Sequence, residues 1–521
     1  MTEVLGGRLV LEDAVVAGRV TVEDGLIAAV EVDPDAPSLA GGPYLAPGFV
    51  DVHVHGFGGH DAMGGLDALD GMARALLRHG VTSFLPTAVT APLAALIGFT
   101  ARVRDWLPGA PADGAEPLGA NLEGPFLAEA RRGAHDPAHL LDPADVDAAD
   151  LARLADGLRL ITIAPELPGA LDRIGWFAAH GVAVSLGHSA ATPAEARAGY
   201  AAGATGTTHL FNAMTGLDHR SPGLAAAALL DDDAWVELIA DGFHVDPALW
   251  PLIARLKPVD RLVLVSDAVA LAGTGDGLGT LGGLAVEVRG GRVTLAGSDT
   301  LAGSVLALDE AVRRLVTAGI GLPAAVAAAG RAPLALIGVT DRGRLAAGQR
   351  ADIVELDDDL RVRRVMRAGA WQGEAARGPA YPRGREGRAM PNEPKPTVVV
   401  ERFYAAIDAD DVGAMSALCA DDVVVRYPAD GRLPYGGTWR GREGLLAFLE
   451  AHEAAEEILE FSVSSMLAEG DVVIASGVFR GRARDTGRTW ATDFVHVLTV
   501  AGGRIRRWTS YFDTAAALDA H

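Results

Sequence analysis

The middle of the chain alternates short apolar runs of strand character with longer segments of helical periodicity. Strand-type runs separated by helical patterns predict parallel strands joined by crossover helices. The candidate strands are 48–54, 81–87, 117–123, 158–165, 182–188, 204–210, 235–243 and 261–267. Eight strand–helix units predict an α/β fold, a TIM-type (β/α)8 barrel over residues 48–339. In such a barrel the functional residues lie at the carboxyl ends of the strands.

Turn-rich segments with alternating polarity flank this region on both sides. Residues 1–47 and 340–371 share short strands and Gly-containing turns, as in GGRLVLEDAVVAGRVTVEDGLIAAV and GRLAAGQRADIVELDDDLRVRRVMRAG. This texture is typical of a small sheet. We therefore expect one small β-sandwich domain that is built from both flanks of the barrel.

The rest of the chain divides into a linker and a further folding unit. Residues 372–396 are rich in Gly, Pro and Arg and lack periodicity, which indicates a linker. Residues 397–521 resume with an amphipathic helix, a strand in DDVVVRYP, a helix near 442–457 and three long strands. This order predicts a compact α+β domain.

Composition narrows the chemistry that this architecture can carry. The chain has 45 basic and 68 acidic residues and a formal charge of −23, so no nucleic-acid partner is expected. No apolar run reaches the roughly 20 residues that span a bilayer, and we expect no membrane association. Residues 1–10 lack a secretory signal pattern, so we expect a cytoplasmic protein. Cys419 is the single cysteine, which excludes thiolate metal sites.

Metal-binding and acid–base side chains stand at six of the eight predicted strand ends. They are His53 with His55, Glu123, His188, His209, His244 and Asp267. A His-x-His pair places both side chains on one face of a strand, so both can reach one ion. Nitrogen and oxygen ligands without sulfur suit Zn²⁺, with Fe²⁺, Co²⁺ or Mn²⁺ as alternatives. One such histidine could simply cap backbone groups, but the set together favours a metal site.

A series of motifs in residues 1 to about 371 carries a family resemblance. The motifs are APGFVDVHVHG, LEGPF, RRGAH, SLGHS, THLFNAM, RSPGL, ADGFHV, SDA and TLAGS. In this order they resemble the amidohydrolase superfamily and, within it, the N-acetylglucosamine-6-phosphate deacetylase family. The resemblance implies hydrolysis of the acetamide of N-acetylglucosamine 6-phosphate to glucosamine 6-phosphate and acetate, in amino-sugar catabolism.

The resemblance also implies how metal is held. Many superfamily members bridge two metals with a carboxylated lysine at the end of the fourth strand. Here that strand ends in TIAPE, and the only lysines, Lys257 and Lys395, lie at no predicted strand end. The family instead implies Glu123 as the carboxylate ligand. One metal is implied on Glu123, His188 and His209, and a second on His53, His55, Glu123 and Asp267, giving one or two ions per subunit.

The groups that act on substrate follow from the same matching. Asp267 is implied as the catalytic residue that takes a proton from water and delivers it to the leaving amine. Contacts to the sugar phosphate are implied for Ala134, His135, Asn212, Ala213, Arg220, His244, Leu301, Ala302 and Gly303. Arg220 and His244 suit a phosphate dianion, although Arg220 could also be a loop residue paired with Asp218. Because the family forms dimers, we expect a homodimer.

Residues 397–521 resemble SnoaL-like domains of the ketosteroid-isomerase (nuclear transport factor 2-like) type, in which a curved sheet wraps helices around an apolar pocket. The resemblance rests on ERFYAAIDADDVGAMSALCADDVVVRYP and GGRIRRWTSYFDTAAAL. The candidate pocket residues are Tyr427, Trp439, Asp493, His496, Trp508, Tyr511 and Asp513. This fold serves enzymes and binding proteins alike. Because interior aromatic residues are usually core, we expect a ligand-binding or dimerisation module.

Two alternatives to this deacetylation stay open. One is another amidohydrolase activity, on a different N-acyl or cyclic amide substrate. The other is a degenerate barrel that serves as a scaffold for the second domain. The presence of a ligand residue at every matched position disfavours the scaffold.

Overall fold

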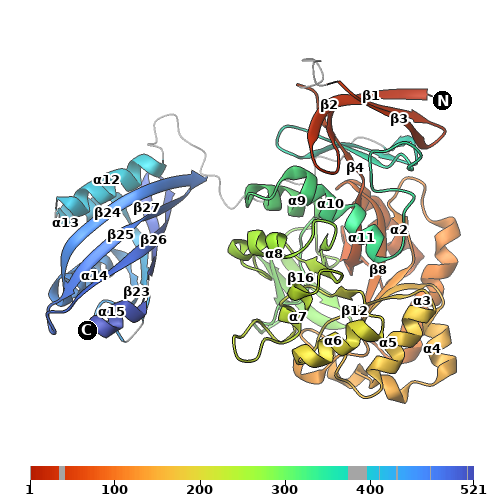
Figure 1. Cartoon of the computed structure of the whole chain (residues 1–521), viewed down its shortest axis with the longest axis horizontal. Coiled ribbons are helices and arrows are strands. Elements are labelled where there is room, and N and C mark those ends of the chain that lie inside the picture. The colour runs from red at the N-terminus through yellow and green to blue at the C-terminus, as the bar shows by residue number, and fades with distance from the viewer. Residues whose placement is uncertain are drawn as a thin grey trace. The chain divides into compact units, whose positions relative to one another are not determined.

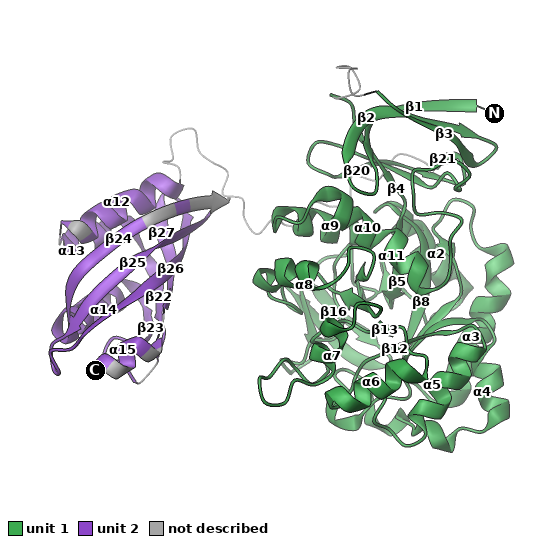
Figure 2. Cartoon of the chain, viewed as in Figure 1, with its two compact units in different colours: residues 1–381 green, residues 382–521 purple. Residues whose placement is uncertain are grey.

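The computed structural model describes residues 2–33, 41–372, 396–409, 411–429, 432–469, 471–512 and 514–521. Figure 1 labels many of its helices and strands. The chain divides into two compact units, residues 1–381 and residues 382–521 (Figure 2). The predicted linker, 372–396, falls almost wholly outside the described residues. Among the described helices, none has the length and apolar character to cross a membrane.

Eight parallel strands form a nearly closed barrel in the first unit (Figure 1). The strands are β5 (Phe49–Val54), β8 (Val81–Val89), β10 (Ala120–Glu123), β11 (Leu158–Ile163), β12 (Ala183–Leu186), β13 (Gly206–Thr207), β14 (Trp235–Leu238) and β15 (Leu262–Leu264), paired in this order, with β9 (Glu116–Pro117) added beside β8. Near the seam, the Asp267 amide donates to the His53 carbonyl over 2.9 Å. The predicted barrel is confirmed.

The barrel forms because its strands are apolar along their length and its helices are apolar on one side. Every residue of β5 and β8 is buried, as expected for parallel strands that are covered on both faces. Helix α2 turns Leu69, Met72 and Leu76 inward. The helices of this unit are α2 (Leu66–Leu77), α3 (Leu93–Trp106), α4 (Ala148–Ala155), α5 (Ala170–Ala179), α6 (Pro193–Ala202), α7 (Leu224–Leu230), α8 (Trp250–Leu256), α9 (Leu308–Thr317), α10 (Leu322–Ala329) and α11 (Arg331–Leu336).

Two barrel strands end earlier than the apolar pattern predicts. The runs 182–188 and 204–210 form strands only over Ala183–Leu186 and Gly206–Thr207. His188 and His209, which follow these strands, have φ angles of 46° and 26°. A positive φ is incompatible with extended backbone and is uncommon outside glycine. The boundaries are therefore set by the backbone turn that aims each histidine, which hydropathy does not encode.

A small antiparallel sheet follows the last barrel strand, and the apolar pattern does not predict it. It consists of β16 (Gly277–Leu281), β17 (Leu284–Arg289) and β18 (Arg292–Leu295). The chain then returns to the barrel, where the Ser304 amide donates to the Asp267 carbonyl over 2.7 Å. This insertion carries the TLAGS motif back to the carboxyl end of β15.

Both flanks of the barrel contribute strands to one mixed sheet. Its seven strands are, in spatial order, β21 (Ala370–Gln372), β20 (Val362–Arg367), β19 (Ile353–Leu356), β4 (Tyr44–Pro47), β1 (Thr2–Val10), β2 (Val15–Glu23) and β3 (Leu26–Val32). Leu9, Val20, Ile27 and Ile353 form part of its own core. As expected, the segments before and after the barrel form one sheet together. The exact bounds between this sheet and the barrel stay a prediction, because both belong to one compact unit.

The second unit is an α+β domain, as predicted. Its six-stranded sheet has the order β23 (Gly437–Arg440), β22 (Cys419–Tyr427), β27 (Arg504–Phe512), β26 (Thr489–Ala501), β25 (Val472–Ala483) and β24 (Glu456–Glu469). Burial alternates along β25, so one face of the sheet is covered and the other is exposed. Its helices are α12 (Pro396–Asp408), α13 (Val412–Leu418), α14 (Gly441–Ala455) and α15 (Thr514–Ala520).

The same alternation separates the candidate pocket residues of this unit. His496 and Trp508 are buried on the covered face, and Tyr427 and Trp439 pack against that core. Asp493 and Tyr511 are exposed on the opposite face, so they do not line the interior. Asp513 lies outside the described residues.

Acid should weaken the second unit through His496. Its ring is 2 % exposed, and burial lowers its pKa from 6.5 to about 3. The unfolded chain therefore binds more protons between these values, and stability falls as the pH drops through this interval. We expect a loss of about 2 kcal/mol between pH 7 and pH 5 from this group alone. Calorimetry of the full chain at both pH values measures the shift of the corresponding unfolding transition.

The variant His496→Phe is expected to lose that part of the pH dependence, because phenylalanine has similar volume and no titrating group. The control His219→Gln removes an exposed histidine and should change nothing. Equal pH dependence in the wild type and in His496→Phe would contradict the prediction.

Candidate metal centre and active site

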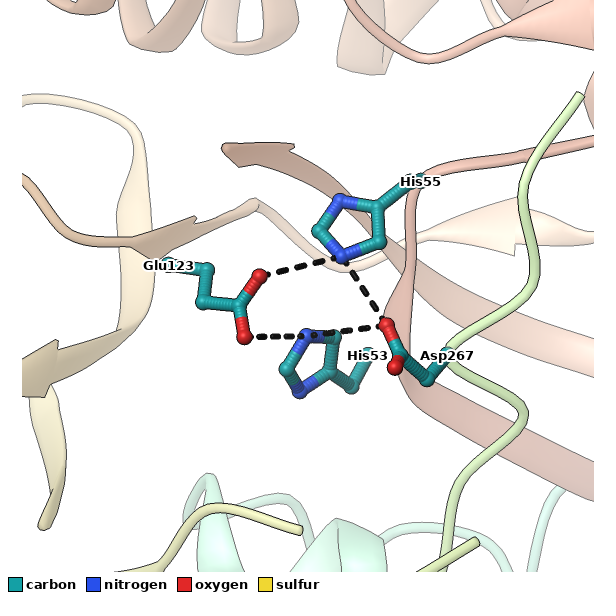
Figure 3. A group of neighbouring side chains, drawn as sticks. All are labelled: His53, His55, Glu123 and Asp267. Carbon is teal, nitrogen blue, oxygen red and sulfur yellow. Dashed lines mark ion pairs between the residues drawn. The ribbon is translucent and has the colours of Figure 1, made fainter. Parts of the chain in front are cut away.

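Glu123, at the end of β10, lies at the centre of a cluster that the strand ends bring together. His53 reaches it from β5, His55 from directly after β5, and Asp267 from beyond β15 (Figure 3). The Nε2 atom of His55 lies 3.2 Å from Glu123 Oε2 and 3.0 Å from Asp267 Oδ1. The Nε2 atom of His53 lies 3.7 Å from Glu123 Oε1 and 3.6 Å from Asp267 Oδ1. All four side chains are buried.

A further pair of histidines contacts Glu123 through one of its carboxylate oxygens. The Nε2 atoms of His188 and His209 each lie 2.8 Å from Glu123 Oε1 and 3.1 Å from each other. Glu123 is therefore shared by two groups of nitrogen ligands. This geometry fits a metal site with Glu123 as its shared carboxylate.

The hydrogen bonds behind the rings set the tautomers. The Nδ1 atom of His55 contacts the Thr87 carbonyl at 3.2 Å, and that of His188 contacts the Arg131 carbonyl at 2.8 Å. A carbonyl only accepts, so each Nδ1 carries a proton and each Nε2 faces Glu123, where an ion can take the place of a second proton. This is the form in which imidazole binds a metal.

His135 has the opposite arrangement. The Thr90 amide donates to its Nδ1 over 3.2 Å, so the proton of the neutral ring is on Nε2. That Nε2 lies 3.2 Å from Glu123 Oε2. His135 is therefore a hydrogen-bond donor at the centre, and it differs in this from the histidines whose lone pairs converge on Glu123.

Backbone conformation singles out three of these residues. His188, His209 and Asp267 have φ angles of 46°, 26° and 51°. Non-glycine residues in this region are strained, and such strain gathers at functional sites. Contacts around each residue hold it there; Asp267, for example, is bonded through its amide to His53 and through its carbonyl to Ser304.

The charges of the cluster favour a bound cation. Burial alone would raise the pKa of Glu123 and of Asp267, but the neighbouring imidazoles outweigh it and lower both. Burial alone would lower the pKa of His55, but Asp267 and Glu123 outweigh it and raise the value to about 9. The two carboxylates thus hold positive charge strongly. In addition, His53 Nε2 is buried without a hydrogen-bond partner among the described residues, as a ligand atom would be.

Comparisons with known proteins agree with this geometry. The amidohydrolase family matches residues 44–372, and the SnoaL-like domain matches residues 400–508. The chain belongs to the amidohydrolase family. The cluster of His53, His55, Glu123 and Asp267 fits the metal site of an amidohydrolase.

Relatives of this amidohydrolase are deacetylases of amino-sugar phosphates. It is 42% identical over 347 residues to N-acetylgalactosamine-6-phosphate deacetylase of Escherichia coli O157:H7, covering 66% of this chain and 91% of that protein. It is 40% identical over 394 residues to the human N-acetylglucosamine-6-phosphate deacetylase, covering 71% and 94%.

Solved structures give the same result. The N-acetylglucosamine-6-phosphate deacetylase of Thermotoga maritima matches with a TM-score of 0.67 and 32% identity, covering 71% of this chain and 100% of that one. A variant of the Mycobacterium smegmatis deacetylase, in complex with N-acetyl-D-glucosamine 6-phosphate, matches with a TM-score of 0.66 and 35% identity, covering 71% and 99%.

The predicted substrate contacts of the amidohydrolase lie in segments around the centre. A Cβ built on Gly133 would lie 3.4 Å from His188 and 3.8 Å from the Ala213 side chain. Ala213 and Ala134, the residue after Gly133, therefore belong to segments next to His188. Asn212 donates from its side chain to the carbonyls of His209 and Leu210. It therefore holds the backbone of this turn.

The TLAGS segment, with Leu301, Ala302 and Gly303, packs against Asp267. Gly303 has a φ of +70°, and a Cβ there would approach the Asp267 carbonyl oxygen to 2.9 Å. Glycine is therefore required for this close approach.

The two residues predicted to bind phosphate, His244 and Arg220, differ in their surroundings. The side chain of His244 is buried, and its Nδ1 lies 2.7 Å from Asp241 Oδ2. Burial alone would lower its pKa, but Asp241, Asp267 and Glu123 raise it. Arg220 is exposed, and Asp218 accepts from its backbone amide over 2.8 Å. Asp218 thus pairs with Arg220 through the backbone of the loop, and a phosphate contact by the Arg220 side chain stays a prediction.

One buried carboxylate beside the centre is absent from the sequence predictions. Glu237, in β14, is 1 % exposed and lies 3.1 Å from His53 Nδ1. Its sequence signal is an acidic residue inside the apolar run WVELIA. Buried charges are rarely found without a partner, and this could have marked it.

Proposed function

We propose that this amidohydrolase hydrolyses the acetamide of N-acetylglucosamine 6-phosphate to glucosamine 6-phosphate and acetate, in amino-sugar catabolism. The observation that carries the proposal is the position of Glu123 between two groups of inward-facing imidazoles. The identity of about 40% to deacetylases of two N-acetylhexosamine phosphates supports the substrate class.

We propose that Glu123, His188 and His209 hold one divalent ion and that His53, His55, Glu123 and Asp267 hold a second. The nitrogen and oxygen donor set suits Zn²⁺ best, with Fe²⁺, Co²⁺ and Mn²⁺ as alternatives. A divalent ion bound here supplies Lewis acidity, which activates water and polarises a carbonyl.

The chain's own residues then handle the protons. Asp267 is ionised at neutral pH, since His55 and His53 lower its pKa against the effect of burial. It accepts a proton from the attacking water and delivers it to the amine, which leaves only when protonated. His135 donates from Nε2 to Glu123, because the Thr90 amide keeps the proton on that nitrogen, and it is proposed to contact the sugar phosphate as well.

Arg220 and His244 are proposed to bind the phosphate. A charged hydrogen bond of this kind contributes about 1.5–3 kcal/mol. The variant Arg220→Ala is therefore expected to raise KM for N-acetylglucosamine 6-phosphate by about 10- to 100-fold, with a smaller effect on kcat. Acetate release at varied substrate concentration measures both.

The unphosphorylated sugar is the control for this prediction. If Arg220 binds phosphate, its loss should leave the weak turnover of N-acetylglucosamine unchanged. An unchanged KM for the phosphorylated substrate would remove Arg220 from the phosphate site.

The proposed activity is tested by metal analysis of the purified protein, followed by acetate release from the 6-phosphates of N-acetylglucosamine, N-acetylgalactosamine and N-acetylmannosamine. The unphosphorylated sugars, N-acyl amino acids and cyclic amides complete the panel. Turnover of the last two groups with none of the sugar phosphates would favour another amidohydrolase activity. A metal-loaded protein inactive on the whole panel would indicate a scaffold.

We propose a homodimer and a ligand-binding or dimerisation role for the SnoaL-like domain. The exposed face of its sheet carries Ile474, Val478, Val495 and Tyr511 on three adjacent strands. Grouped apolar side chains of this kind are typical of contact surfaces. Light scattering of the full chain measures the oligomeric state. A cytoplasmic location is likewise part of the proposal and rests on the sequence alone.

A further inference from the structure

The imidazole of His53 is held by a carboxylate that belongs to neither group of metal ligands. Glu237 approaches it from β14, with Oε2 3.1 Å from His53 Nδ1. The same oxygen accepts from the His209 amide over 3.2 Å. Glu237 thus contacts one residue from each proposed metal position, through the side chain of His53 and through the backbone of His209.

This carboxylate determines what His53 can do. Glu237 Oε2 accepts from the His209 amide and so acts as an acceptor for His53 Nδ1 as well, which leaves Nε2 as the nitrogen that can bind an ion. That Nε2 faces Glu123 and Asp267 and has no hydrogen-bond partner among the described residues. His55 and His188 are held by neutral carbonyl groups instead. A carboxylate partner also makes an imidazole a more basic ligand than a carbonyl partner does.

We propose that Glu237 is a positioning residue that enables the His53–His55 half of the centre to hold its own ion. It fixes the tautomer and orientation of His53 and raises the basicity of Nε2. The inference rests on the metal centre of the proposed function. It concerns metal binding and does not depend on the identity of the substrate.

The test is a calorimetric titration of metal-free full-length protein with Zn²⁺. The number of ions bound per chain is then measured by metal analysis after gel filtration. Wild-type protein is expected to bind two ions per chain. The variant Glu237→Met, which keeps the side-chain length, should weaken one of them by about 10- to 100-fold and leave the other within a few-fold. The affinity of Glu237→Gln for this ion should lie between those of the wild type and Glu237→Met. Its amide oxygen still accepts from His53 Nδ1, but it carries no charge.

A cycle with His53 shows whether Glu237 acts through that ring. His53→Gln should lose the same ion, and adding Glu237→Met to it should change metal binding no further. Co²⁺ absorption provides a second readout, since only the bands of one ion should disappear. The matched control is Glu116→Gln, which removes a carboxylate bonded to Arg342 and Arg350; it should lower stability and leave both metal constants unchanged.

Three outcomes would overturn the inference. These are a Glu237→Met protein that binds both ions like the wild type, equal weakening of both ions, and wild-type protein that binds a single ion. Failure of the proposed function looks different: two ions bind, one depends on Glu237, and no sugar phosphate is deacetylated.

Discussion

Replacing Asp267 by asparagine is expected to reduce kcat/KM for deacetylation by about 10³-fold or more, because asparagine cannot take and return a proton. The substitution is nearly isosteric. The Asp267 amide donates a hydrogen bond to the His53 carbonyl, and the Asp267 carbonyl accepts one from the Ser304 amide. Both bonds involve only backbone atoms and should stay in place. The side chain, whose Oδ1 lies 3.0 Å from His55 Nε2, loses its charge.

The measurement is acetate release at saturating and limiting substrate, with metal content determined on the same samples. The ion on Glu123, His188 and His209 should remain, so loss of activity with retained metal assigns the proton transfer to Asp267. Asp276→Asn, which alters a carboxylate bonded to the Gly290 amide outside the centre, is the control and should be fully active. Near-normal turnover of Asp267→Asn would refute the assignment.

Glu123→Gln is expected to abolish metal binding at both positions and to reduce turnover by at least about 10³-fold. Both oxygens of Glu123 are shared: Oε1 lies 2.8 Å from the Nε2 atoms of His188 and His209, and Oε2 lies 3.2 Å from His55. The amide of glutamine has one acceptor atom and no charge. Its NH₂ group would also face one set of ligand positions, where it repels a cation.

Metal analysis and acetate release check this prediction together. The control is Glu195→Gln, which weakens the exposed cap at the start of α6 and should leave metal content unchanged. If Glu123→Gln retained two ions per chain, Glu123 would not be shared between them. If it lost only one ion, Glu123 would be required at that position alone.

The architecture is largely predictable from local pattern. The apolar runs that predict barrel strands are buried along their length in β5 and β8, and the alternation in β25 covers one face of the second unit. These features can be predicted locally because the apolar positions within a strand decide which of its faces can be buried. The same logic places ligand residues at strand ends, since the carboxyl ends of parallel strands meet at one end of the barrel.

Where the sequence prediction and the structure differ, the cause is backbone geometry that hydropathy does not encode. The strands before His188 and His209 stop early because those residues turn with positive φ. Asp493 and Tyr511 face outward in the second unit because strand alternation, and not residue type, decides the face.

The sequence by itself determined the class of barrel, the absence of lysine and thiolate ligands, and the set of histidines and carboxylates that reach one end of the strands. Tertiary structure alone decided how those groups are used. The Thr90 amide makes Nε2 of His135 a hydrogen-bond donor. Glu237, 184 positions from His53 along the chain, holds Nδ1 of His53 and leaves its Nε2 as the proposed metal ligand. A ring nitrogen takes its role from the group behind it, and that group comes from another strand.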